Sequence, residues 1–194
     1  MNWQITDYIL QDLNYIQKAI NNLEKEIKKI IQICDLINSS LKNKGKIILC
    51  GNGGSAAECQ HIAAEFVGRF LIKDRKALPA IALTTDTSIL TALGNDFGYD
   101  KIFSRQIEAL GNSNDVLIGY STSGKSQNII NAFHIAKKLE IQTIGISGIN
   151  QIPNADVSIT VQSNHTPHIQ TVHNIIGHVI CDILERFYME TDNV

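Results

Sequence analysis

From residue 46 onward the sequence alternates short apolar runs with longer stretches of helical character, and this alternation limits the possible folds more than any other feature. The runs, such as KIILC at 46–50, are apolar at consecutive positions. Strands of that kind are buried on both faces, which is typical of a parallel sheet with helices on either side. We therefore predict a three-layer α/β fold with a five-stranded parallel sheet. The predicted strands are 46–50, 79–84, 115–120, 142–147 and 156–161, and the predicted helices are 55–70, 87–93, 101–110, 127–139 and 167–189.

Residues 1–44 are predicted to form an N-terminal helical extension of the same single domain, 1–194, whose α/β core is 45–194. From Ile9 to Leu41 the apolar residues recur in alternating steps of four and three, which is the spacing of a helix seam that packs against other helices. A helix or helical pair lying on its own domain would show the same spacing. Apolar residues beside the seam, such as Leu10 and Ile31, indicate more than one covered face and favour oligomerisation.

Composition excludes several classes of protein. The chain has a net charge of -2 and no long run of Lys or Arg, so we expect no nucleic-acid partner. No window of about 18 apolar residues exists, so we expect no membrane span. The N-terminus lacks a cationic region followed by an apolar stretch, which argues against a signal peptide and for the cytoplasm. The four cysteines are widely spaced and are interpreted as small, reduced, buried side chains: Cys34, Cys50, Cys59 and Cys181.

Two predicted strands end in loops suited to an anion. In GNGGS at 51–55 the missing side chains let backbone N–H groups approach a ligand, and a helix follows. In YSTSGKS at 120–126 four aliphatic hydroxyl groups precede the next helix. Each loop alone could be a tight turn or a helix cap. Together they favour a phosphorylated ligand. The first loop has Ala56 where a dinucleotide-binding G-x-G-x-x-G motif needs glycine, and it is not a Walker loop, so a sugar phosphate is favoured over a nucleotide.

Polar side chains stand on two apolar helices. His61 and Glu65 are four residues apart and share a helix face, and Gln170, His173 and His178 follow far along the chain. If Glu65 and His178 converge, they could move a proton at a carbon beside a carbonyl, as aldose–ketose isomerisation through an enediol requires. Alternatively, His61, Glu65, Gln170 and His178 could hold a zinc-type metal. Positions 170 and 178 are separated by about 12 Å of helix rise, and His173 competes with His178 for the role.

Four motifs in this order carry a family resemblance: GNGGSAAECQHIAAEF at 51–66, NDFGYDKIFSRQIEALG at 95–111, STSGKSQN at 121–128 and HIQTVHNIIGH at 168–178. Together they resemble the bacterial phosphoheptose isomerase family of the sugar isomerase (SIS) domain group, over about residues 45–185. The resemblance implies a flavodoxin-like SIS fold and a homotetramer with active sites near subunit contacts. It also implies conversion of D-sedoheptulose 7-phosphate to D-glycero-D-manno-heptose 7-phosphate, the first step of bacterial heptose biosynthesis for lipopolysaccharide cores or capsules.

The resemblance also assigns residues. It implies Glu65 and His178 as the acid/base pair. It implies that a zinc ion is bound by His61, Glu65, Gln170 and His178. The substrate-binding residues that it implies are Asn52, Gly53, Gly54, Ser55, Glu65, Asn95, Asp96, Ser121, Thr122, Ser123, Ser126 and Gln170. Lys125 stands where the family often has a smaller polar residue such as Asn.

Two other functions remain open at this point. A sister group with the same fold and tetramer binds the bacterial replication initiator protein and has no catalytic role. An isomerase of another sugar phosphate, or a regulatory SIS module that senses one, is the other alternative. The set of His61, Glu65, Gln170 and His178 favours an enzyme, because a binding scaffold has little reason to assemble these groups.

Overall fold

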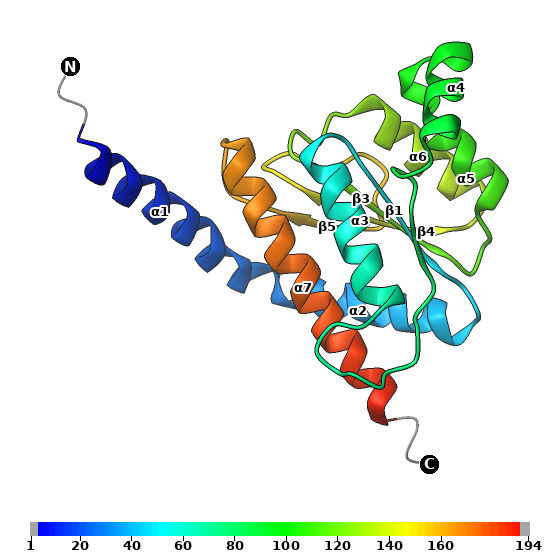
Figure 1. Ribbon diagram of the computed structural model, residues 1–194, viewed down its shortest axis with the longest axis horizontal. Coiled ribbons are helices and arrows are strands. Elements are labelled where there is room, and N and C mark those ends of the chain that lie inside the picture. Colours follow the sequence, from blue (N-terminus) through cyan, green and yellow to red (C-terminus); the bar gives the residue numbers. More distant parts are fainter. Residues whose placement is uncertain (1–3, 191–194) are drawn as a thin grey trace.

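The computed structural model describes residues 4–190, so residues 1–3 and 191–194 of the predicted domain lie outside the described residues. Helices and strands alternate along the core (Figure 1). The α-helices are α1 Ile5–Asn21, α2 Ile27–Lys42, α3 Gly54–Val67, α4 Thr87–Phe97, α5 Ser104–Leu110, α6 Gln127–Lys138 and α7 Thr166–Glu190. The strands are β1 Ile47–Gly51, β2 Ala80–Ala82, β3 Val116–Ser121, β4 Gln142–Ser147 and β5 Val157–Thr160, and short 3-10 helices cover Asn22–Glu26 and Tyr99–Lys101.

The sheet confirms the predicted fold class. Its five strands are parallel and lie in the order β2-β1-β3-β4-β5, the flavodoxin-like order. Gly51 at the end of β1 pairs with Tyr120 near the end of β3. The chain departs from β1 to β2 on one side and then returns to β3 on the other, so the loops after β1 and β3 meet at the point where ligands gather in such sheets.

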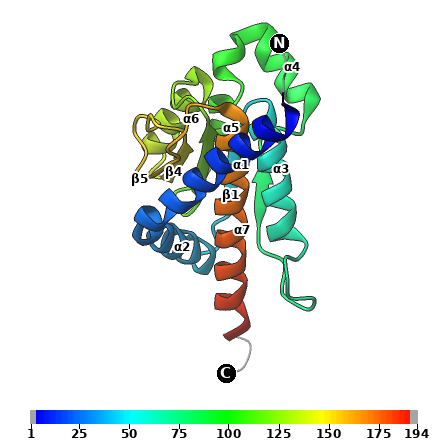
Figure 2. The same cartoon turned by 90° about the vertical axis from the view of Figure 1, so that its left-hand side faces the viewer.

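Two hydrophobic cores cover the two faces of the sheet. Alternate residues of β1 point to opposite sides, so Ile47 and Leu49 join the core under α2, α3 and α7, whereas Ile48 and Cys50 join the core under α5 and α6. Figure 2 shows α7 running between α2 and α3 along the length of the molecule. This arrangement is the predicted three-layer sandwich.

The N-terminal seam is divided between two helices with different environments. The 3-10 helix Asn22–Glu26 interrupts it. In α2 the seam residues Ile30, Cys34 and Ile37 are buried against the core, but α1 extends away from the body of the molecule (Figure 1). Within the described residues of α1, Ala19 is the buried one, and Leu13 is 56% exposed. The core covers the seam in α2 and reaches Ile20 and Leu23, whereas Ile9 and Leu13 stay exposed.

Several predicted boundaries differ from the observed ones. Helix α4 runs to Phe97, four residues beyond the prediction, and ends before Gly98, which has a φ of 88° that favours glycine. Strand β2 lies at the edge of the sheet and is three residues long, shorter than predicted, because only Ala80–Ala82 pair with β1.

The four cysteines are buried and unpaired, as predicted. Burial raises the pKa of the Cys50 thiol to about 12, which makes it a poor nucleophile. None of the helices in the described range is long and apolar enough to cross a membrane.

Candidate active site

The glycine loop, residues 51–55, connects β1 to α3. Gly53 has a φ of 56°, and a Cβ at Gly51 would lie 2.6 Å from the carbonyl oxygen of Ser55, so both positions need glycine. No side chain caps the N-terminus of α3, whereas Asp86 caps α4 by accepting a hydrogen bond from the backbone N–H of Ile89 at 2.9 Å. The backbone N–H groups of Ser55 and Ala56 already donate to the carbonyl oxygens of Asn52 and Gly53, both at 3.0 Å, so the loop offers an anion the positive end of α3 rather than those N–H groups.

The hydroxyl loop, residues 121–126, connects β3 to α6 and brings its three serine hydroxyl groups together. The Oγ atoms of Ser121 and Ser126 are 3.0 Å apart, and those of Ser121 and Ser123 are 3.5 Å apart. Gly124, with a φ of 69°, turns the backbone so that its N–H donates to Oγ of Ser121. Thr122 and Ser123 line a cavity of about 240 Å³ beside this loop. Hydroxyl groups that point toward one another in this way suit the several oxygens of a phosphate.

A pair of amides ties the two loops together. Asn52 and Asn128 exchange hydrogen bonds, with Nδ2 to Oδ1 distances of 2.9 and 2.8 Å. The Tyr99 hydroxyl also donates to Oδ1 of Asn52, at 3.0 Å. Asn128 and Tyr99 lie in the quoted motifs, but nothing in composition or spacing distinguished them. Their role depends on contacts between segments that are far apart in sequence.

Helices α3 and α7 lie side by side and run parallel (Figure 1). The residue numbers of the contacting pairs increase in the same direction along the two helices. Glu58 accepts a hydrogen bond from Asn174, and one turn farther along His61 contacts His178. The two helices approach closely at Gly177, where a Cβ would lie 2.5 Å from Cδ1 of Ile62. This parallel packing brings residues more than 100 positions apart onto one shared face.

His61, Glu65 and His178 meet on that face. Nε2 of His61 lies 2.7 Å from Nε2 of His178, and Nδ1 of His61 lies 3.7 Å from Oε1 of Glu65. One ligand atom of each of the three residues lies within 4.8 Å of the others. The His61 side chain is 42% exposed, so the group is open to solvent or to a partner.

These three residues fit a zinc-type metal ion. If one of the two facing nitrogens carries a proton, the neutral imidazoles form a hydrogen bond. If neither nitrogen carries a proton, their lone pairs face and repel each other. A cation between the rings would remove that repulsion. Imidazole nitrogens and a carboxylate oxygen are ordinary zinc ligands at about 2.0–2.2 Å from the ion, and small side-chain movements would give that geometry.

His173 is buried elsewhere, which distinguishes it from His178. It is 1% exposed and packs against the ring of Tyr120 in the core, with ring centroids 5.7 Å apart. Burial lowers the pKa of His173 to about 4, so its ring is neutral at physiological pH. Of the two histidines that the sequence left as competitors, His178 is the one that meets His61.

Gln170 does not join the cluster within one chain. It lies about 12 Å of helix rise before His178 and packs at the start of α3, where a Cβ on Gly54 would lie 2.5 Å from its Nε2 atom. Its side chain is therefore beside the glycine loop. The structure brings together three of the four implied metal ligands and leaves the fourth near the implied substrate contacts.

Asn95 and Asp96 lie in the last turn of α4, beyond the predicted end of this helix at residue 93. Both are exposed, and Nδ2 of Asn95 donates to Oδ1 of Asp96 at 2.8 Å. Tyr99, which follows them, is the residue of this segment that reaches the glycine loop.

A buried ion pair supports the end of α3 just beyond Glu65. Arg75 Nε donates to Oε1 of Glu185 at 2.8 Å, and both side chains are 2% exposed. The same guanidinium donates to the backbone carbonyl oxygens of Glu65 and Phe66. The sequence did not point to this pair, because Arg75 lies in a charged loop and Glu185 on a helix with other polar residues.

The fold and these loops define the class of protein. A family model described as the SIS domain matches residues 11–148, so the chain belongs to the SIS domain family. A phosphoheptose isomerase from Sulfurimonas denitrificans is 52% identical over 174 residues, which are 88% of this chain and 89% of that protein. One from Helicobacter pylori is 45% identical over 176 residues, 89% of this chain and 90% of that protein.

Solved structures agree with the sequence relatives. The phosphoheptose isomerase from Neisseria gonorrhoeae matches with a TM-score of 0.86 and 38% identity, covering 94% of this chain and 100% of that chain. The one from Francisella tularensis matches with a TM-score of 0.88 and 32% identity, covering 95% of this chain and 100% of that chain. Within the SIS domain family, the chain belongs to the phosphoheptose isomerases.

Proposed function

We propose that this chain converts D-sedoheptulose 7-phosphate to D-glycero-D-manno-heptose 7-phosphate through an enediol, as the first step of bacterial heptose biosynthesis in the cytoplasm. One observation carries the proposal: a carboxylate and two imidazoles from helices far apart in the chain converge within 4.8 Å. A protein that only binds another protein has no need of such a group. The family name of the relatives supports the same choice over the replication-initiator alternative.

The phosphate is proposed to bind at the two loops. Ser121, Thr122, Ser123 and Ser126 would donate hydroxyl groups to it, and the uncapped start of α6 would favour its charge. Lys125 is exposed, lines the cavity beside the hydroxyl loop and adds a positive charge there.

The sugar is proposed to contact the glycine loop and its neighbours. These substrate contacts are Asn52, Gly53, Gly54, Ser55, Asn95, Asp96 and Gln170. Asn52 accepts hydrogen bonds from Asn128 and Tyr99, which supports a fixed orientation for this substrate contact.

Glu65 and His178 are proposed as the acid/base pair. Glu65 takes a proton from C1 of the ketose and returns it to C2. His178 gives a proton to the oxygen on C2 and accepts the proton of the hydroxyl on C1, so the enediol forms and collapses without net change in the enzyme. Arg75 holds the carbonyl of Glu65 at 2.7 Å and so limits movement of the base.

His61, Glu65 and His178 are proposed to hold a zinc ion, with Gln170 as a further ligand if a rearrangement or a second subunit brings it close. A bound zinc ion would supply Lewis-acid polarisation of the sugar carbonyl.

A second copy of the chain is proposed to complete each site, within a homotetramer. Glu65 lies about 16 Å along α3 from Gly54, which is farther than an extended seven-carbon sugar phosphate reaches from its phosphorus to C2. This separation supports a site in which the acid/base pair of one chain and the phosphate loops of another act on the same substrate. The uncovered apolar side of α1, which includes Ile9 and Leu13, supports association between copies.

The test is a coupled assay for aldoheptose formation from sedoheptulose 7-phosphate, run beside five- and six-carbon ketose phosphates. We expect turnover with the seven-carbon substrate, and we expect Glu65→Gln and His178→Gln each to abolish it while circular dichroism and oligomer size stay unchanged. His134→Gln, which changes an exposed histidine on α6, is the matched control and should retain activity. Full activity in either active-site variant would refute the assignment.

Mixed oligomers test whether the site is shared. Glu65→Gln is combined with a Ser121→Ala/Ser126→Ala variant, unfolded and refolded together, and assayed against each variant alone. Activity that appears only in the mixture is expected, because some sites then combine an intact acid/base pair with an intact loop. An inactive mixture that forms the normal oligomer would mean that each site is built within one chain.

A further inference from the structure

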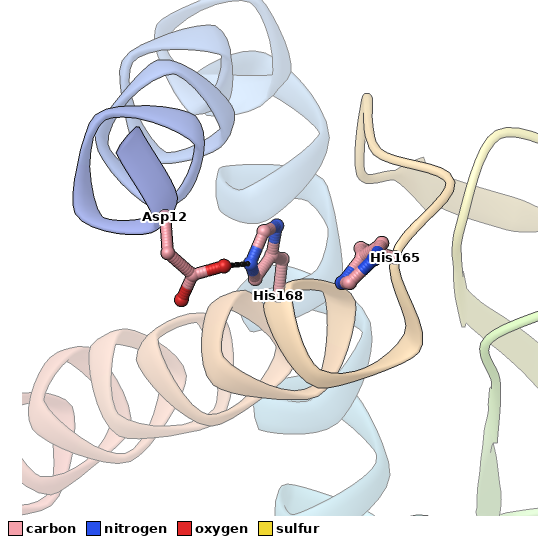
Figure 3. A group of neighbouring side chains, drawn as sticks. All are labelled: Asp12, His165 and His168. Atoms are coloured by element: carbon pink, nitrogen blue, oxygen red, sulfur yellow. Dashed lines mark hydrogen bonds and ion pairs between the residues drawn. The ribbon is translucent and has the colours of Figure 1, made fainter. Parts of the chain in front are cut away.

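A second group of metal-type side chains lies where α1 meets the start of α7 (Figure 3). Asp12 comes from α1, His165 immediately precedes α7, and His168 is in its first turn. One oxygen of Asp12 and one nitrogen of each histidine lie within 4.8 Å of one another. Helix α1 and the start of α7 are therefore joined by the same kinds of ligand atom that occur at the His61 cluster.

The contacts within this group are close and partly buried. Nε2 of His168 lies 2.7 Å from Oδ1 of Asp12, and His168 is 5% exposed. The ring of His165 packs on that of His168, with centroids 4.7 Å apart and an angle of 35° between the ring planes. Tyr15 lies near the His168 ring as well, with centroids 6.5 Å apart.

We propose that Asp12, His165 and His168 form a second site for a divalent transition metal of the zinc type. Two imidazole nitrogens and one carboxylate oxygen are a donor set that such ions accept, and the carboxylate offsets part of the positive charge. All three residues also line a cavity of about 560 Å³, which leaves room for water at the remaining coordination position. The proposal does not depend on the isomerase activity.

A simple hydrogen bond between Asp12 and His168 is the alternative. It accounts for the 2.7 Å contact and for the buried ring. It uses His165 only as a ring packed on His168, although this exposed residue has a ligand nitrogen within 4.8 Å of both other groups. A metal ion would use all three residues.

The metal would attach α1 to the rest of the protein. Most of α1 is exposed, so apolar packing anchors its first half weakly. Asp12 and His168 are 156 residues apart in sequence, and a link that closes so long a loop removes much entropy from the unfolded chain. The same link would fix the first turn of α7, two residues before Gln170.

The test measures metal binding in the absence of the first cluster. The His61→Gln/His178→Gln variant is freed of metal with a chelator and titrated with Co²⁺, whose visible absorption reports four-coordinate nitrogen and oxygen ligands. Asp12→Asn and His165→Gln are then each added to that background. His134→Gln, an exposed histidine outside both groups, is the matched control.

We expect the background variant and the control to bind one equivalent of Co²⁺, which Zn²⁺ displaces. We expect the Asp12→Asn and His165→Gln variants to lose this Co²⁺ binding. His165 is exposed, so its variant should fold normally, which circular dichroism checks. Zn²⁺ should also slow amide exchange over residues 5–16 in the background and not in the His165→Gln variant. No Co²⁺ uptake in the background, or equal uptake in all variants, would overturn the proposal.

Discussion

Replacing Glu185 with glutamine tests whether the buried ion pair at the end of α3 stabilises the protein. Glu185 accepts four hydrogen bonds, three of them from backbone N–H groups of Phe70, Leu71 and Ile72 at 3.0, 2.7 and 2.9 Å. The fourth comes from Arg75 Nε at 2.8 Å. Each carboxylate oxygen receives two of these bonds, so the group holds the loop after α3 against α7.

The structure gives the size of the expected effect. Glutamine has one acceptor oxygen, and its NH₂ group would face two of the four donors. Hydrogen bonds to a charged group contribute about 1.5–3 kcal/mol each, so the loss of two costs about 3–6 kcal/mol. The Arg75 guanidinium, which is 2% exposed, would also lose its counter-charge. Breaking a buried pair by removing one partner costs about 3–5 kcal/mol, and we expect a loss near 4 kcal/mol at pH 7.

The effect should depend on pH. Burial by itself would raise the pKa of Glu185, but the Arg75 hydrogen bond and the three backbone donors outweigh it and lower that pKa below the ordinary value of 4.5. A lowered pKa in the folded state means that the charged carboxylate stabilises the fold at any pH above 4.5. That stability is lost as pH falls below 4.5 toward the pKa of the folded state.

The assay is urea unfolding at fixed protein concentration, since the proposed association between copies would also contribute to stability. The free energies of unfolding of the parent protein and Glu185→Gln should differ most at pH 7 and converge below pH 4.5. Glu108→Gln, which removes an exposed carboxylate paired with Arg105, is the matched control and should cost less than about 1 kcal/mol. A cost for Glu185→Gln no larger than that of the control, or a difference that stays constant into acid, would refute the reasoning.

Three further variants test the site. Ser126→Ala should raise KM more than it lowers kcat in steady-state kinetics, because phosphate binding is similar in the ground and transition states; a loss confined to kcat would contradict this. Gly54→Ala should lower activity with unchanged circular dichroism, because its Cβ would meet Nε2 of Gln170 at 2.5 Å and displace that flexible side chain; unchanged kinetics would separate Gln170 from the substrate site. Gly177→Ala should destabilise the protein by about 1–3 kcal/mol in urea unfolding, because its Cβ would press on Ile62 and separate α3 from α7; no measurable cost would mean that the helices adjust freely.

Much of the fold could be predicted from the sequence because the signals are local. A strand that is apolar at consecutive positions, such as Ile47–Gly51, requires cover on both faces wherever it lies. Element boundaries depend on more distant contacts. Strand β2 is short because only Ala80–Ala82 pair with β1, and the end of α4 depends on Gly98. The periodicity of the sequence indicates neither boundary.

The site could be predicted only in part. The glycine and hydroxyl loops were recognisable because they follow strands and have unusual composition. The choice between His173 and His178 depends on the direction each side chain takes from α7, and both fit the same apolar helix pattern. One points into the core against Tyr120, and the other points toward α3.

The sequence by itself determined the class of fold, the two loops at the strand ends and the residue types available for proton transfer or metal binding. Each of these follows from neighbours within one element, where spacing fixes which side chains share a face. The tertiary structure alone decided that α3 and α7 run parallel, so that His61 meets His178 and Gln170 meets Gly54. It also decided that α1 packs against the start of α7, where Asp12 meets His168. Pairings of this kind depend on how separate elements pack, and local spacing carries no information about it.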